Sequence, residues 1–404
     1  MRPPIFFIHP PKSGGSTVIS FFDLNKGKDQ FVNFVWEKDN NWDSNRAKLW
    51  ESGVGGGHQI YGIHRGLKAP LTYCTILRDP LARQMSHYWY AVNGKNGEVG
   101  RGASLSAVEA LAGCGEISLD EWVSESYGGR NLFVHMLSGH PTVDASSLET
   151  AQFNLRRHIK VAGTCDDMSG FLLRLCGKTD LKLPFYIETN KTDNSSRERP
   201  KLSEWARQKF IEENQLDYAL FNEVKKNLEC EAQAAEGSFL KAIELVRSVQ
   251  AEINKLENPY LHASTIFGFE AEYLAKVRNV IAEFDLRPIE EYIAFEQGRQ
   301  ADLFDMHDGF VDAVRDGVVS GWAVNLHHPE EKVLIEVRVG DEVVATGWSG
   351  AHRPDVREAG YGTAYAGFAI PLPNEALDGF HVTIAHSHEP LHNGGTWRQG
   401  WHPA

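Results

Sequence analysis

The hydrophobic periodicity of this chain changes twice along its 404 residues, and these changes limit the folds that it can adopt. Up to about residue 230, short apolar runs alternate with amphipathic stretches, which is the pattern of an α/β protein. Strands are predicted at residues 5–8, 73–77, 160–164 and 183–189. Helices are predicted at residues 17–22, 80–90, 118–124, 148–157, 168–175 and 202–214. Strands that are apolar on both faces, with helices between them, predict a P-loop-like parallel sheet flanked by helices.

A helical segment separates this α/β region, residues 1–230, from the C-terminal part of the chain. Residues 231–308 carry apolar side chains at helical spacing, such as Ala242, Leu245 and Val249. The repeat is too short for a coiled coil. We therefore expect a helical connector whose helices pack on a neighbouring domain.

From Gly309 onward, apolar residues recur with a period of about two, which is typical of strands. Strands are predicted at residues 317–325, 332–348 and 380–386. Gly340 and Asp341 have the composition of a two-residue hairpin turn. We expect residues 309–404 to form an independent antiparallel β-sandwich.

The formal net charge of -13 confines any anion site to a local basic pocket within an acidic protein. It argues against broad binding to nucleic acid or to a membrane surface. Five cysteines without C-x-x-C spacing predict reduced thiols, and the C-terminal histidines predict solvated side chains rather than a metal site. Because the chain shows no secretory signal and no run of about 18 apolar residues, we expect a cytoplasmic protein without a transmembrane segment.

The segment IHPPKSGGST, residues 8–17, lies between the first predicted strand and a predicted helix. Small residues at such a turn direct backbone N–H groups and a helix N-terminus towards one point, and Lys12 adds a full positive charge. The order differs from GxxxxGK[ST], because Lys12 precedes Gly14 and Gly15. The motif predicts a phosphate cradle without a nucleotide-hydrolysing metal centre, or else a tight turn capped by Ser16 or Thr17.

A second polar cluster occurs in TILRDPLARQMSHYWY, residues 75–90. Arg78 ends a predicted strand, Pro80 takes the first position of a helix, and Ser86 follows about two turns inside it. Arg78 can hold a phosphate through two hydrogen bonds, and Ser86 can donate to the same group.

These two segments resemble the 5′- and 3′-phosphosulfate-binding motifs of the sulfotransferases that use 3′-phosphoadenosine 5′-phosphosulfate (PAPS). The closest resemblance is to the carbohydrate sulfotransferases typified by heparan sulfate 2-O-sulfotransferase. Residues 131–139, 151–175 and 186–200 fit the same family, so the resemblance covers roughly residues 1–230. It implies a PAPS-dependent carbohydrate O-sulfotransferase, with PAPS as sulfuryl donor, a glycan as acceptor and no metal.

The resemblance also implies roles for individual residues. The 5′-phosphosulfate would be held by Lys12, Ser13, Gly14, Gly15, Ser16 and Thr17, and the 3′-phosphate by Arg78 and Ser86. Sulfuryl transfer needs a cation at the leaving group and a base at the acceptor hydroxyl, and Lys12 suits the first role. For the base, GHQIYGIHRG offers two histidines. His64 aligns best with the base of the family and is our predicted catalytic residue, with His58 as the alternative.

Other charged and aromatic positions carry weaker signals. Arg65, Lys68 and Arg83 would line the pocket or be solvated, and Trp89 and Tyr90 are more typical of a core than of a sugar-binding surface. A polar loop follows the last predicted strand of the α/β region and would form a lid or an exposed loop without a role. Its charged and amide residues are Asn190, Lys191, Arg197 and Arg199.

The segments SGWAV, RPDV and GFAIPLP, within residues 320–373, resemble a β-rich module appended to bacterial glycosyltransferases and other polysaccharide-modifying enzymes. This implies a bacterial protein that acts on glycans. The module would bind carbohydrate through tryptophans or pack against the catalytic domain. The candidate tryptophans are Trp322, Trp348, Trp397 and Trp401.

Two other functions stay open. One is a P-loop kinase or nucleotide hydrolase, which the missing GK[ST] order disfavours. The other is a non-catalytic glycan-binding protein with a transferase fold, which the combination of Lys12, His64 and Arg78 disfavours.

Overall fold

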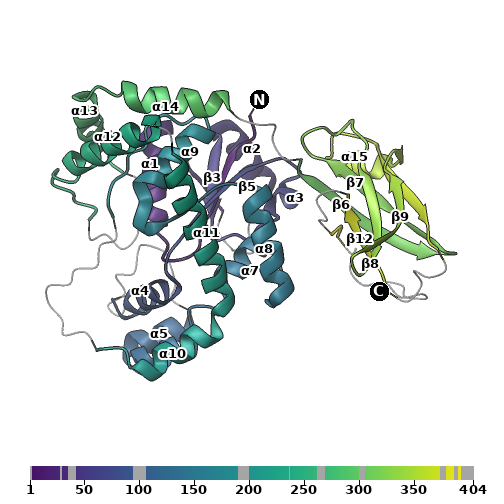
Figure 1. Cartoon of the computed structure of the whole chain (residues 1–404), viewed down its shortest axis with the longest axis horizontal. Helices are drawn as coiled ribbons and strands as arrows, with labels where there is room; N and C mark the ends of the chain where they lie inside the picture. The colour runs from purple at the N-terminus through teal and green to yellow at the C-terminus, as the bar shows by residue number, and fades with distance from the viewer. Residues whose placement is uncertain are drawn as a thin grey trace. The chain divides into compact units, whose positions relative to one another are not determined.

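The computed structural model places most of the chain in two compact units (Figure 1). The described residues are 2–27, 30–34, 42–93, 106–189, 200–235, 237–261, 269–299, 305–373, 379–385 and 390–392. The first unit, Met1–Tyr61 with Leu71–Asp302, is called the parallel-sheet unit. The second, Gly62–Pro70 with Leu303–Ala404, is called the antiparallel unit.

The parallel-sheet unit is built on five strands within the described residues, in the order β2-β3-β1-β4-β5. The strands are β1 (Ile5–Ile8), β2 (Val32–Asn33), β3 (Val54–Gly57), β4 (Thr72–Leu77) and β5 (Ile159–Thr164). All neighbouring strands pair in parallel, which confirms the predicted α/β class and three of the four predicted strands. β1 lies in the centre, between β3 and β4, so the loops that follow these three strands leave the sheet at one edge.

The strand β3 has the sequence VGGG, which carries no apolar pattern, and it was not predicted. Its glycines allow the neighbouring strands to approach very closely. A Cβ atom at Gly56 would lie 2.3 Å from the Phe7 carbonyl oxygen, and one at Gly57 would lie 2.3 Å from the Phe34 carbonyl oxygen. The strand therefore depends on the absence of side chains rather than on β propensity.

The predicted strand at residues 183–189 is wrong. This segment is extended but pairs with side chains instead of a neighbouring strand. The Ser20 hydroxyl accepts a hydrogen bond from the Ile187 N–H at 2.8 Å, and the Gln250 amide bonds to both backbone polar groups of Tyr186. Side chains thus form hydrogen bonds with backbone groups that, in a strand, would bond to a neighbouring strand.

Helices surround the sheet. Those of the α/β region are α1 (Gly15–Lys26), α2 (Trp42–Ser52), α4 (Pro80–Asn93), α5 (Ala107–Cys114), α6 (Leu119–Ser124), α7 (Leu132–Ser138), α8 (Ala145–Arg157), α9 (Met168–Lys178), α10 (Glu204–Glu213) and α11 (Gln215–Ala234). A short 3₁₀ turn, Cys165–Asp167, links β5 to α9. The six helices predicted from the sequence are confirmed, with ends that differ by a few residues.

Residues 231–308, the predicted helical connector, contribute α12 (Gly237–Ile253), α13 (Ala271–Ala282) and α14 (Arg287–Gly298). Their buried residues belong to the same hydrophobic core as the sheet. Val246, Val277 and Ile293 join Phe7 and Phe171 in that core. Figure 1 shows α12, α13 and α14 gathered beside α1 and α9. These helices are therefore part of the parallel-sheet unit up to its boundary at Asp302.

The antiparallel unit carries two antiparallel sheets within its described residues, in the orders β10-β11-β7-β6 and β12-β8-β9. Its elements are β6 (His307–Arg315), β7 (Val318–Asn325), β8 (Leu334–Val339), β9 (Glu342–Trp348), β10 (Ala351–His352), α15 (Pro354–Glu358), β11 (Tyr365–Pro371) and β12 (His381–Ile384). Gly340, with φ of 57°, and Asp341 form the predicted turn between β8 and β9. The antiparallel pairing is confirmed. Both sheets contribute to one core, and their stacking as a sandwich stays a prediction.

The short helix α3 (Ile63–Leu67) also belongs to the antiparallel unit, although it lies between β3 and β4 in the sequence. The Lys68 ammonium donates to the Ala359 carbonyl and lies 5.6 Å from the centre of the Tyr361 ring. Within the described part of the chain, no helix is both long and apolar enough to cross a membrane.

Candidate functional site

The two sequence motifs meet at the carboxyl edge of the parallel sheet. Ile8 pairs with Thr75 in the register of β1 and β4, and the Thr75 hydroxyl donates to the Ile8 carbonyl at 2.9 Å. Because the strands run in parallel and end side by side, the loop after β1 and the loop after β4 leave the sheet together. This edge is where ligands bind in open parallel sheets.

The loop after β1 is a tight, glycine-dependent turn into α1. Lys12 and Gly14 both adopt left-handed φ angles, of 66° and 73°, and Gly14 caps α1 without a side-chain hydrogen bond. A Cβ atom at Gly15 would lie 1.8 Å from the His9 ring, so only glycine lets this imidazole cover the first turn. The Ser13 hydroxyl is completely buried and has no hydrogen-bond partner among the residues that the structure describes. Because most buried hydroxyls are hydrogen-bonded, this hydroxyl is a candidate donor to a polar ligand.

Lys12 and Arg78 lie together in this loop. The Arg78 Nη1 donates to the Lys12 carbonyl at 3.3 Å, and the Lys12 ammonium lies 4.1 Å from the centre of the Tyr90 ring. Burial and the charge of Arg78 lower the pKa of Lys12 to about 8, while Glu109 opposes this shift. No carboxylate in the described ranges forms an ion pair with Lys12 or Arg78. Lys12 and Arg78 are therefore two basic groups that could bind an anion together.

Two histidines pack beside Lys12. The rings of His9 and His58 lie 4.5 Å apart, and the His58 Nδ1 contacts the His9 carbonyl oxygen at 2.8 Å. Burial, and then the charges of His58 and Lys12, lower the pKa of His9 well below its ordinary value. Desolvation by the surrounding protein, and then the charges of Lys12 and His87, lower the pKa of His58, although its hydrogen bond to the His9 carbonyl opposes this. Both shifts favour the neutral imidazole.

A third histidine, His87, completes the titratable groups of the site. Its Nε2 is hydrogen-bonded at 2.7 Å to Glu109, the first-turn carboxylate of α5. Burial alone would raise the pKa of Glu109, but hydrogen bonds from His87 and Ser106 lower it to about 2. The charge of His87 in turn lowers the pKa of His58, which links the pair to the rest of the site.

Three of these residues, namely His9, His87 and Glu109, were not predicted from the sequence. His9 and His87 each stand next to a predicted site residue or loop, so their positions in the chain gave a signal that could have been used. Glu109 gave none, because only the tertiary fold brings α5 to α4. Tyr90, predicted as a core residue, is half-buried and contacts the Lys12 ammonium instead.

The remaining predicted cofactor residues lie around the same loop. Ser16 and Thr17 are half-buried on the first turn of α1, and Ser86 is half-buried on α4. In the part of the chain that is described, no hydrogen bond joins Ser86 to Arg78. Arg83, expected to line the pocket or be solvated, is almost completely buried and donates to the Gln84 side chain at 2.8 Å.

His64, the predicted base, has a different setting. It lies on α3, in the antiparallel unit, and its side chain is completely buried. His58, the alternative, belongs to the parallel-sheet unit and is exposed to solvent. Within the parallel-sheet unit, His58 contacts His9 beside the Lys12 loop.

Several weaker predictions fall elsewhere. In the antiparallel unit, Trp348 is 60% exposed and Trp322 packs on the Tyr361 ring at 4.8 Å. Some of the predicted positions lie outside the described residues. They are Asn190, Lys191, Arg197, Arg199, Trp397 and Trp401.

Comparison with known proteins found no similar protein family or curated protein. No family model matches this chain, and no curated protein gives a significant match.

Proposed function

We propose that this protein transfers a sulfuryl group from PAPS to a hydroxyl group of a carbohydrate. One observation carries the proposal: Lys12 and Arg78, two cations without a carboxylate partner in the described ranges, are hydrogen-bonded together where β1 and β4 end. A donor with phosphates at both its 5′ and 3′ ends needs cations from two neighbouring loops. The resemblance of both motifs to PAPS-binding sequences supports the same choice.

The residues of the loop fit an anionic donor. The buried Ser13 hydroxyl lacks a partner among the described residues, and the glycines keep side chains out of the first turn of α1. We assign Lys12, Ser13 and the small residues up to Thr17 to the 5′-phosphosulfate, and Arg78 and Ser86 to the 3′-phosphate. When bound, PAPS supplies an activated sulfuryl group. The Lys12 ammonium would stabilise the negative charge that develops on the leaving phosphate.

For the base, we now prefer His58 to His64. A general base must reach the acceptor hydroxyl in its neutral form. The accessible surface of His58 leaves it open to an acceptor, and its lowered pKa, caused mainly by the protein around it, favours the neutral form. His64 is completely buried, and a polymer hydroxyl would reach it only after a rearrangement.

Two finer points of architecture belong to this proposal. The β1–α1 turn would serve as a P-loop-like cradle, with backbone N–H groups and the N-terminus of α1 around the anion. The two antiparallel sheets would stack as a β-sandwich that assists in the handling of glycans.

Labelled PAPS tests the proposal. The full chain is incubated with ³⁵S-labelled PAPS and a panel of bacterial glycans, with and without a metal chelator. Transfer of label to a glycan, unaffected by the chelator, is expected. Magnesium-dependent hydrolysis of ATP, without transfer of label, would point instead to a kinase or nucleotide hydrolase. Binding of glycan without turnover of either donor would point to a glycan-binding protein.

A further inference from the structure

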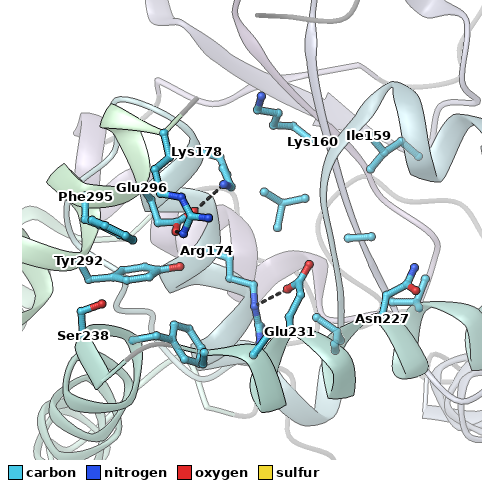
Figure 2. A pocket seen from close by; sticks show the side chains of 18 of the residues that line it. Ile159, Lys160, Arg174, Lys178, Asn227, Glu231, Ser238, Tyr292, Phe295 and Glu296 are labelled. Carbon is cyan, nitrogen blue, oxygen red and sulfur yellow. Dashed lines mark hydrogen bonds and ion pairs between the residues drawn. The ribbon is translucent and has the colours of Figure 1, made fainter. Parts of the chain in front are cut away.

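A cavity of about 460 Å³ lies beside β5, the last strand of the parallel sheet (Figure 2). Its walls come from β5 and from α9, α11, α12 and α14. None of the residues predicted to hold PAPS lines it. Its volume lies within the range of small-molecule sites in proteins, which is about 300–1,000 Å³.

Basic side chains outnumber acidic ones in this cavity. Four basic residues, Lys160, Arg174, Lys178 and Arg299, line it together with two acidic ones, Glu231 and Glu296. In a chain with a net charge of -13, such a local excess of positive charge runs against the overall composition. A concave surface with this charge favours an anionic ligand.

Most of these charges are already compensated. Arg174 Nε pairs with Glu231 at 3.1 Å, and Lys178 pairs with Glu296 at 2.5 Å, as the dashed lines of Figure 2 show. Arg299 shares Glu296 at 3.8 Å. Lys160 differs, because it forms no ion pair or hydrogen bond within the described ranges and is half-buried. Burial, and then the charge of Lys178, lower its pKa. Lys160 is therefore the basic residue with which an anionic group of a ligand would pair in this cavity.

Aromatic rings form one wall of the cavity. Phe239 and Tyr292 meet edge to face, with ring centres 5.4 Å apart. The Arg174 guanidinium lies 5.1 Å from the centre of the Phe239 ring. The Arg299 guanidinium lies at the same distance, 5.1 Å, from the centre of the Phe295 ring. Ion pairs and cation–π contacts thus fix the wall before any ligand arrives. A planar ring would find edge-to-face or stacked contacts there.

We propose that this cavity binds a small aromatic compound with a single anionic group, which pairs with Lys160 while the ring packs against Phe239 and Tyr292. The site is separate from the proposed PAPS site and does not depend on sulfuryl transfer. Sulfate esters and carboxylates share the required chemistry, since each presents a single negative charge through oxygen atoms.

Calorimetric titration of the full chain with 2-naphthyl sulfate and with 2-naphthoate tests this proposal and separates the two kinds of anion. At least one of them should bind at concentrations up to about 1 mM, and neutral 2-naphthol should bind much more weakly. The same titrations on the Arg78→Ala variant should give unchanged affinities. This arm distinguishes the cavity from the PAPS site, so that the inference and the proposed function can fail separately.

Lys160→Gln should weaken the binding of the anion about tenfold, because it removes one charge-assisted contact. Lys160→Arg keeps the charge and should retain most of the affinity. Lys182→Gln, an exposed lysine outside the cavity, is the matched control and should change it by less than about twofold. Absence of binding by both anions, equal binding of 2-naphthol, or equal affinities of wild type and Lys160→Gln would each overturn the proposal.

Discussion

The carboxyl edge of the parallel sheet and the antiparallel unit both bury charged groups, but they compensate these charges in opposite ways. At the sheet edge, Lys12 and Arg78 are neighbouring cations. Burial, and then the charge of Arg78, lower the pKa of Lys12. Burial is also the main cause that lowers the pKa of His9 and of His58, and the charge of Lys12 adds to it. Glu109, a carboxylate that opposes the shift of Lys12, lies 2.7 Å from His87.

In the antiparallel unit, two described buried or half-buried charges, Asp308 and Arg338, have polar partners of their own. Asp308, 3% exposed, accepts a hydrogen bond from the Tyr361 hydroxyl and lies 3.6 Å from the His392 ring nitrogen. Arg338 pairs with Glu336 at 2.8 Å. Asp308 and Arg338 thus have partners within the described chain, whereas Lys12 and Arg78 have no carboxylate partner in the described ranges. This difference is what the proposed anion site predicts, because a buried charge needs a partner.

The largest expected effect concerns the base. His58→Ala should lower turnover by about 10² to 10⁴, the usual contribution of general-base catalysis, and leave the binding of adenosine 3′,5′-bisphosphate nearly unchanged. Because the pKa of His58 is lowered from 6.5, wild-type turnover should fall only when the pH drops below about that value. Turnover assays across pH check both points.

His64→Ala is the matched control, since it removes a histidine from the other unit. It should lower thermal stability, because it leaves a cavity, with little effect on turnover per folded molecule. An inactive but folded His64→Ala protein, together with an active His58→Ala protein, would return the role of base to His64.

The next effect concerns the compensated charges. Asp308→Ala should lower the free energy of unfolding by about 2–4 kcal/mol, because it leaves the buried groups around Tyr361 without their acceptor. Denaturant unfolding measures it. Asp312→Ala breaks the exposed pair with Arg353 and should cost only about 0–1 kcal/mol. Equal costs for the two variants would mean that the Asp308 network is not a structural one.

The smallest effect concerns the pH dependence of donor binding. The pKa of Lys12 is lowered to about 8, so the ammonium loses its proton between pH 7 and 9, and the affinity for adenosine 3′,5′-bisphosphate should fall about tenfold. Lys12→Arg keeps its charge over this range and should give a flat profile. For stability the sign is reversed: the unfolded chain binds the proton more tightly, so Lys12 opposes folding at neutral pH and this penalty fades as the pH rises from about 8 to 10.5. A wild-type affinity that is constant up to pH 9 would contradict the lowered pKa of Lys12.

Local sequence patterns were sufficient to predict the two strands that position the candidate site. Apolar runs gave β1 and β4, and the parallel arrangement brought Lys12 and Arg78 together because both follow neighbouring strands. Sequence patterns failed where tertiary contacts decide the structure. The VGGG strand exists because its glycines tolerate close neighbours, and the apolar run 183–189 pairs with side chains of α1 and α12.

The choice between His58 and His64 shows the same limit. The two histidines are six positions apart in one short segment, so no local pattern assigns them to different units. Residues Gly62–Pro70 belong to the antiparallel unit, in which Lys68 contacts Ala359 and Tyr361, nearly 300 residues further along the chain. Such long-range contacts cannot be inferred from periodicity.

Calorimetric titration of the full chain with adenosine 3′,5′-bisphosphate and adenosine 5′-monophosphate tests most directly whether the uncompensated cations form a donor site. The bisphosphate should bind at least about tenfold more tightly, because Arg78 addresses the 3′-phosphate that only this nucleotide carries. Arg78→Ala should remove most of that difference. Equal affinities for the two nucleotides, in the wild type and in the variant alike, would contradict the assignment of the sheet edge to PAPS.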